Sequence, residues 1–240
     1  MLHHSLILRE LVLAEHPPHW PRPFRLELGL KECLLLEGVA LEQAQELVQV
    51  AATLKLPQEG EVRLWGRQTA ALSRPELFAL RRRLACISPR LALLHRLTVA
   101  ENLVLGPCFF QARTAPAVLE EHSPLLERLE LTDLLRAFPP ELPDNVAYRV
   151  LFARELMKEP ELILAVMGPP LTPVDQQRLI LPLLQDWQAK KGVAMLLAGR
   201  SLRLFTPLAH RLLRFHHGRF LEHYFLEHES RPLETFLPLF

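Results

Sequence analysis

The segment from residue 34 to residue 61 constrains the fold of this chain more than any other stretch. It predicts a short buried strand at 34–36, a bend at Glu37 and Gly38, and a helix from about 41 to 54. Apolar residues in that helix recur at spacings of three and four, which gives it one buried face. They are Leu41, Ala44, Leu47, Val48, Ala51 and Ala52. A strand, a tight turn and a long helix form the frame on which nucleotide-binding proteins carry a phosphate loop.

The residues that bind phosphate are missing from this frame. A phosphate loop, GxxxxGK[ST], needs glycines for converging backbone N–H groups, a lysine for the outer phosphates and a hydroxyl for Mg²⁺. When the pattern starts at Gly38, Gln43 falls at the second glycine, Ala44 at the lysine and Gln45 at the hydroxyl residue. Each lost charge-assisted contact costs roughly 1.5–3 kcal/mol. Three such losses remove about four decades of affinity.

Composition limits the remaining function classes. The chain has 240 residues, 49% hydrophobic and 23% charged, which is enough for one large domain or for one domain with an insertion. No apolar run reaches the roughly 18 residues of a membrane span, and charges interrupt residues 1–16, which therefore make a poor signal peptide. A net charge of +1 gives no reason to expect nucleic acid as a partner. We expect a soluble, cytoplasmic protein.

The cysteine and glycine content supports the expectation of a cytoplasmic protein without a phosphate loop. Cys33, Cys86 and Cys108 are odd in number and lack metal-ligand spacing, so we expect reduced and packed thiols, with Cys86 in the core. The chain has 9 Gly against 21 Pro, and is therefore poor in the residue on which phosphate loops depend.

The remaining elements alternate between strands and helices. Residues 5–14 predict an edge strand, and a proline-rich link leads to a second edge strand at 24–30. Ser73 and Glu76 form a helix-capping signal, and residues 115–138 predict two amphipathic helices with a further capping signal at Thr132 and Asp133. Further strands are predicted at 61–64, 84–87, 161–170 and 192–201, further helices at 146–158, 175–190 and 232–240, and a hairpin turning at His217 and Gly218.

Residues 60–106 carry a resemblance to a known family. The GE pair at 60–61, the SRPEL helix start at 73–77 and the LTVAENL run at 97–103 together resemble the ATP-binding cassette, the ATPase subunit of ABC transporters. Within it they are most similar to the ATPase subunit of bacterial Mla-type systems, which transport phospholipid with MCE proteins. The resemblance extends over nearly the whole chain. It implies an α/β fold of the RecA-like P-loop NTPase class, with a core and N-terminal β subdomain at 1–88 and 158–240 and an inserted helical subdomain at 89–157.

The family's nucleotide motifs are substituted where the resemblance places them. The glutamine that contacts Mg²⁺ and the attacking water falls at Pro89, which offers neither donor nor acceptor. The signature LSGGQ reads LPDNV, with Pro143, Asp144 and Asn145 replacing Ser-Gly-Gly. Asp144 falls at the start of a helix, where it is expected to cap that helix and to repel an anion.

The second half of the chain continues this pattern. The family's Asp-Glu pair, which holds Mg²⁺ and polarises water, falls at Val166 and Met167. The aspartate of the dimer-contact loop falls at Pro173, with Asp175 two places late. Arg200 stands at the switch histidine; it can bind phosphate but cannot exchange protons near neutral pH.

The resemblance implies a set of partners. A permease would dock through Pro89, Arg90, Leu91 and Leu94, an MCE-type lipid-binding subunit would belong to the same complex, and the cassette would form a homodimer or a heterodimer with another cassette. The protein would lie at the cytoplasmic face of the inner membrane. Our leading hypothesis is a pseudo-ATPase that needs neither ATP nor Mg²⁺. Two alternatives remain, namely a divergent ATPase that uses ATP and Mg²⁺ through Arg200 and the arginines at 81–83, and a stand-alone interaction module.

Three smaller features have a chemical and a structural interpretation. Arg81, Arg82 and Arg83 could bind phosphate, but a solvated helix face is the expected interpretation. Four histidines could hold a metal, namely His216, His217, His223 and His228. We expect instead that they belong to an exposed hairpin, because no cysteine or carboxylate ligand accompanies them. Ser88 with His95 could form a nucleophilic pair, but no nucleophile elbow surrounds Ser88.

Overall fold

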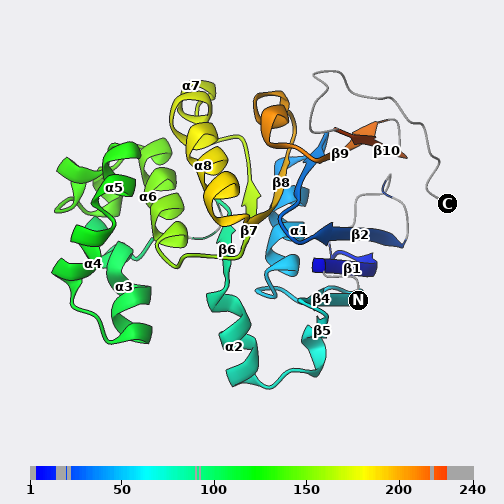
Figure 1. The fold of residues 1–240 in the computed structure, drawn as a ribbon, viewed down its shortest axis with the longest axis horizontal. Helices are drawn as coiled ribbons and strands as arrows, with labels where there is room; N and C mark the ends of the chain where they lie inside the picture. Colours follow the sequence, from blue (N-terminus) through cyan, green and yellow to red (C-terminus); the bar gives the residue numbers. More distant parts are fainter. Residues whose placement is uncertain are drawn as a thin grey trace.

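The computed structural model describes residues 4–14, 20, 23–89, 91, 93–216 and 219–225, without the side chains of residues 110 and 111. It contains two sheets (Figure 1). The smaller is antiparallel and has the spatial order β2 (Phe24–Gly29), β1 (His4–Val12), β4 (Glu59–Leu64) and β5 (Arg67–Gln68). The larger has the order β10 (Arg219–Tyr224), β9 (Arg211–His216), β3 (Cys33–Glu37), β8 (Ala194–Gly199), β7 (Leu162–Val166) and β6 (Leu84–Ile87).

The larger sheet is parallel except for β10. Its central strands are continuous apolar runs because both of their faces are covered. In β3 the side chain of Leu35 joins one hydrophobic cluster, whereas Leu34 and Leu36 join the other. Because β3, β8 and β7 are parallel, their carboxyl ends lie at one edge of the sheet. Several of the positions that the sequence analysis assigned to nucleotide motifs follow these strand ends.

Different elements cover the two faces of this sheet. One face carries α1 (Leu41–Ala51) and the smaller sheet, whose apolar residues share a single cluster. The other face carries α6 (Asp144–Leu156) and a helical layer in front of it. That layer consists of α3 (Val99–Gln111), α4 (Ala115–Glu121), α5 (Ser123–Arg128) and the 3-10 turns η2 (Thr132–Leu134) and η3 (Pro139–Glu141). Figure 1 shows these helices at one end of the molecule and the smaller sheet at the other.

Four further helical segments occur among the described residues. The helix α2 (Arg74–Arg82) begins with the predicted capping box, in which Ser73 and Glu76 hydrogen bond. A long helix runs from Thr172, its N-cap, through α7 (Pro173–Asp175), a π-helical turn η4 (Gln176–Ile180) and α8 (Leu181–Lys191). A 3-10 segment, η5 (Arg203–Leu208), follows β8, and η1 (Thr69–Ala71) follows β5.

Several expectations are corrected by the pairing of the strands and by the caps. Residues 5–14 are not an edge strand, because β1 pairs with β2 on one side and β4 on the other. Thr132 and Asp133 begin only a 3-10 turn. The helix predicted at 146–158 begins at Asp144 with Pro143 as its N-cap, so Asp144 is not the cap.

Some predictions fall on residues that are not described. The helix at 232–240 and the turn at His217 and Gly218 lie outside the described residues, as does Arg90 of the predicted docking set. Among the residues that are described, no helix is both long and apolar enough to span a bilayer.

Candidate functional site

The turn after β3 keeps its glycine for a reason of packing. Gly38 has φ +84°, and a Cβ atom there would lie 2.4 Å from the carbonyl oxygen of Phe215 on β9. The backbone N–H of Gly38 donates to the carbonyl oxygen of Arg200, at 3.2 Å, and that of Val39 to Gly199, at 3.4 Å. Both backbone donors are therefore used inside the protein.

The helix after this turn begins too early to leave room for a phosphate loop. α1 starts at Leu41, so the positions from 41 to 43 are helical, and the side chain of Gln43 accepts from the backbone N–H of Ala40 at 3.1 Å. Ala44 and Gln45, at the lysine and hydroxyl positions, are both buried. No cation can reach an anion from these positions.

Glu37 is a buried charged residue at this edge of the sheet whose contacts the sequence did not predict. This residue ends β3, directly before Gly38, and is 7% exposed. Its carboxylate accepts from the backbone N–H of Leu202 at 2.8 Å and pairs with Arg214 Nε at 2.6 Å. A buried carboxylate thus occupies the sheet edge where a phosphate would approach. A charged residue at the end of the apolar run LLLE was the available signal.

The end of β7 offers no oxygen ligand from a side chain. Val166 and Met167, at the positions of the metal-binding pair, are buried and apolar. The carbonyl oxygen of Val166 accepts a hydrogen bond from Tyr148 Oη of α6 at 2.8 Å, and the backbone N–H of Met167 donates to Ala198 at 2.8 Å. In the part of the chain that the structure describes, no group of three or more His, Cys, Asp or Glu side chains could hold a metal.

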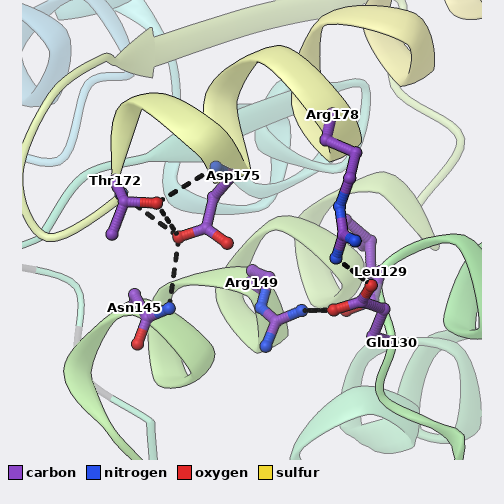
Figure 2. A network of polar contacts seen from close by, with 7 residues as sticks. All are labelled: Leu129, Glu130, Asn145, Arg149, Thr172, Asp175 and Arg178. Carbon is purple, nitrogen blue, oxygen red and sulfur yellow. Dashed lines mark hydrogen bonds and ion pairs between the residues drawn. The ribbon is translucent and has the colours of Figure 1, made fainter.

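The start of α6 is bonded within the chain (Figure 2). Asn145 Nδ2 donates to Asp175 Oδ2 at 3.1 Å, and the same carboxylate accepts from the backbone and hydroxyl of Thr172. Burial acts to raise the pKa of Asp175, but the hydrogen bonds from Thr172 and Asn145 outweigh it, so the pKa is lowered. The positions of the signature and of the dimer-contact loop are thus brought together in one molecule.

Pro89 and Asp144 line an apolar cavity of about 570 Å³ between the core and the helical layer. Its walls include Leu41 of α1 and five prolines, Pro89, Pro139, Pro140, Pro169 and Pro170. Asp144, His95 and Tyr148 are the charged or titratable side chains in this lining. The cavity brings the positions of the phosphate loop, the glutamine and the signature together, yet it offers no lysine or arginine to an anionic ligand.

Arg200 is the one substituted position that keeps a cation near Gly38. Its side chain is exposed, and its carbonyl oxygen accepts from the backbone N–H of Gly38. Pro143 is the N-cap of α6. No contact between Pro143 and Arg200 is recorded among the described residues.

Comparison with known proteins shows which proteins this chain resembles. The sequence is 31% identical over 176 residues to the methionine import ATP-binding protein of Rhizobium johnstonii. The chain is homologous to the ATP-binding cassettes of ABC transporters. The match covers 73% of the cassette and 48% of that protein, so the cassette spans about half the length of the curated relatives it matches. No protein-family model matches the sequence.

Solved structures confirm the predicted fold class of the cassette. A dimeric ATP-binding cassette in a post-hydrolysis state, bound to ADP and phosphate, superimposes with a TM-score of 0.76 at 19% identity, covering 95% of this chain and 98% of the other. The cbiO1 protein of Clostridium perfringens, part of an ABC transporter complex, gives a TM-score of 0.71 at 17% identity, covering 92% and 88%. The cassette therefore has the α/β fold of the RecA-like P-loop NTPase class.

The arginines at 81–83 are not a free helix face. Arg81 Nε donates to Thr53 Oγ1 at 3.0 Å. Arg83 pairs with Glu161 and lies over the ring of Trp65, 4.1 Å from its centroid. Because Arg81 connects α2 to Thr53, the expected solvated face is corrected for Arg81, whereas Arg82 is exposed and the Arg83 side chain is 42% exposed in its pair with Glu161.

The other candidate residues have structural environments. Ser88 is fully buried, whereas His95 is exposed, so Ser88 is inaccessible as a nucleophile. His223 is buried and His216 exposed, while His217 and His228 lie outside the described residues. Cys86 is in the core as predicted; burial, followed by the charge of Glu155, raises its pKa to about 12.

Proposed function

We propose that this cassette is a pseudo-ATPase that docks onto a membrane permease without binding or hydrolysing ATP. The observation that carries the proposal lies at the end of β3. There the buried carboxylate of Glu37 pairs with the guanidinium of Arg214 and accepts a hydrogen bond from the backbone N–H of Leu202. The neighbouring donors of Gly38, Val39 and Ala40 are bonded within the protein. An incoming triphosphate would have to displace these bonds, and the turn has no lysine to offset the cost.

The docking surface of this proposal begins at Pro89, Leu91 and Leu94, with Arg90 as its undescribed member. Leu94 is 49% exposed, and its backbone is fixed because Asn102 of α3 accepts from its N–H at 2.8 Å and donates to its carbonyl oxygen at 3.0 Å. Asn102 itself is fully buried under this loop.

The same side of α3 continues as an exposed apolar face. Leu105 and Phe109 follow Asn102 by three and seven residues, which places them on its side of the helix, and they are 47% and 79% exposed. An apolar surface held on a rigid helix fits the cytoplasmic segment of a permease. In this proposal the cassette lies at the cytoplasmic face of the inner membrane and pairs with a second cassette, either its own copy or another chain.

The proposal also includes the class of molecule that the complex transports. The resemblance of residues 60–106 to Mla-type ATPase subunits favours phospholipid and an MCE-type subunit in the complex. The matched relative from Rhizobium johnstonii is a methionine import ATP-binding protein. Purification of the complex from its native membrane, followed by mass spectrometry of the copurified subunits, separates these alternatives, because an MCE subunit would accompany only the first.

The test of nucleotide binding is equilibrium dialysis with labelled ATP and Mg²⁺. We expect no binding at micromolar concentrations, and micromolar binding would refute the pseudo-ATPase. The competing function is a divergent ATPase, which the exposed Arg200 beside Gly38 favours. Phosphate release that is abolished in Arg200→Ala would establish that alternative.

The test of docking is copurification of the permease with surface variants. Leu94→Asp and Leu105→Asp are expected to lose the permease, whereas Leu56→Asp, at a position that is 81% exposed in the connection between α1 and β4, should retain it. Equal retention by all three variants would exclude this surface, and a stand-alone interaction module would copurify with no permease at all.

A further inference from the structure

The helical layer, residues 98–142, meets the rest of the cassette in two different ways. On one side lies the cavity of about 570 Å³, which Pro139, Pro140 and Leu142 help to line. On the other side the end of α5 meets α6 and the long helix α7–α8, where buried leucines share one apolar cluster and charged side chains pair beside it (Figure 2). Polar contacts therefore add to apolar packing on this second side.

Arg149 of α6 is the buried member of these contacts. It is 7% exposed, and its Nη1 donates to the carbonyl oxygen of Leu129 at 3.0 Å and to Glu130 Oε2 at 2.8 Å. A buried guanidinium needs a paired and hydrogen-bonded partner. Glu130 is the carboxylate that pairs with it among the ion pairs recorded for the described residues.

Glu130 also reaches the long helix. Its second oxygen, Oε1, accepts from Arg178 of the π-helical turn, and two residues earlier Arg128 pairs with Asp186 of α8 at 2.6 Å. Arg178 and Asp186 of this helix thus contact the layer with opposite charges, whereas Asp175 bonds to Asn145 of α6. The carboxylate of Glu130 is thus shared by two helices, α6 and η4.

The backbone of Glu130 is unusual for a residue with a side chain. Its φ is +56°, at the position after the C-cap of α5 where glycine is the ordinary residue. A glutamate persists in such a conformation when its surroundings fix it. The structure records two arginines on its carboxylate and backbone hydrogen bonds from Glu130 to Glu127 and from Leu131 to Leu126, both at 2.9 Å.

We infer that Glu130 is the hub of a polar latch that holds the helical layer against α6 and α7–α8. The latch consists of Glu130, Arg149 and Arg178, with Arg128–Asp186 beside it. When the charge of Glu130 is lost, the layer opens locally while the sheet stays folded. This inference is independent of whether the cassette binds nucleotide.

Hydrogen–deuterium exchange of the full chain tests the latch. In Glu130→Gln the amides of α3, α4 and α5 should exchange about tenfold faster, which corresponds to the loss of one charge-assisted bond, while those of β7 and β8 keep their rates. Arg178→Gln should act on the same helices more weakly, because Arg178 is largely exposed. High salt should accelerate wild-type exchange in these helices more than exchange in Glu130→Gln.

Glu10→Gln is the matched control. Glu10 also has a positive φ, +51°, and pairs with Arg25 at 2.9 Å, but it lies in β1, within the smaller sheet. It should leave exchange in α3–α5 unchanged. Glu130→Gly separates the side chain from the backbone, since it relieves the strain but removes the carboxylate, and should also exchange faster. Unchanged exchange in Glu130→Gln, slower exchange in Glu130→Gly, or a uniform increase over the whole chain would each overturn the latch.

Discussion

The carboxylate of Glu37 and the guanidinium of Arg214 form an ion pair at the carboxyl end of β3, with a distance of 2.6 Å from Nε to Oε2. The two residues face each other on neighbouring parallel strands, β3 and β9. The pair lies beside the turn that the family uses for phosphate, and it gives this edge of the sheet an internal charge balance. Its contribution to stability can be measured without any ligand.

Glu37→Gln should lower the free energy of unfolding by about 1.5–3 kcal/mol, because it removes charge-assisted bonds to a buried group. Urea denaturation followed by circular dichroism measures this loss. Arg25→Gln, which breaks the exposed pair with Glu10, is the control and should cost about 0.5 kcal/mol or less. Similar losses in the two variants would show that the Glu37 pair is no more than a surface pair.

Gly38→Ala should destabilise the protein by roughly 3 kcal/mol or more, because strain at positive φ adds to a clash with Phe215. Gly66→Ala is the control, since Gly66 also has a positive φ but no atom within 4 Å of an added Cβ. It should lose about 1 kcal/mol. Thermal unfolding of both variants makes the comparison, and equal losses would contradict the close approach of β9 to the turn.

Tyr148→Phe removes the hydrogen bond to the carbonyl oxygen of Val166 and should cost about 1–3 kcal/mol, since both groups are buried. Tyr224→Phe, at a side chain that is 46% exposed, should cost about 0.5 kcal/mol or less. Urea unfolding of the two variants provides the measurement. If Tyr148→Phe is as stable as the wild type, the end of β7 is not held by α6 in this way.

The capping box of α2 should depend on pH. Hydrogen bonds from the side chain and backbone of Ser73, followed by that from Arg67, lower the pKa of Glu76 from 4.5 to about 2. Because the pKa is depressed in the folded state, the stabilisation is complete above pH 4.5 and is lost as the pH falls toward 2. A carboxyl titration by NMR measures the midpoint of Glu76, and a midpoint near 4.5 would contradict the box.

The three thiols should differ in reactivity. Burial raises the pKa of Cys33 and Cys86, the latter to about 12, so neither forms thiolate near pH 8. Cys108 is partly exposed. Alkylation with iodoacetamide followed by mass spectrometry should therefore label Cys108 first in the folded protein, and early labelling of Cys33 or Cys86 would show that the core opens.

The sequence predicted the local elements well where one physical signal dominated. Continuous apolar runs identified β3, β6 and β7, the family resemblance placed β8, and the Ser73 and Glu76 pattern identified the start of α2. The strand at 5–14 was found but misplaced at an edge, because alternation reports which faces are buried and says nothing about which strands pair on either side. The subdomain boundaries at 88 and 158 and the permease contacts remain predictions.

The absence of a lysine from residues 38–45 and of a carboxylate from residues 162–167 is a property of the sequence itself, since a missing side chain is missing in any fold. The use that the protein makes of those positions was decided by tertiary structure. Glu37 meets an arginine 177 residues later, Gly38 meets the backbone of Phe215, and Asn145 meets Asp175. These contacts join residues that are distant along the chain, and they form only when packing of the sheet and helices brings the elements together.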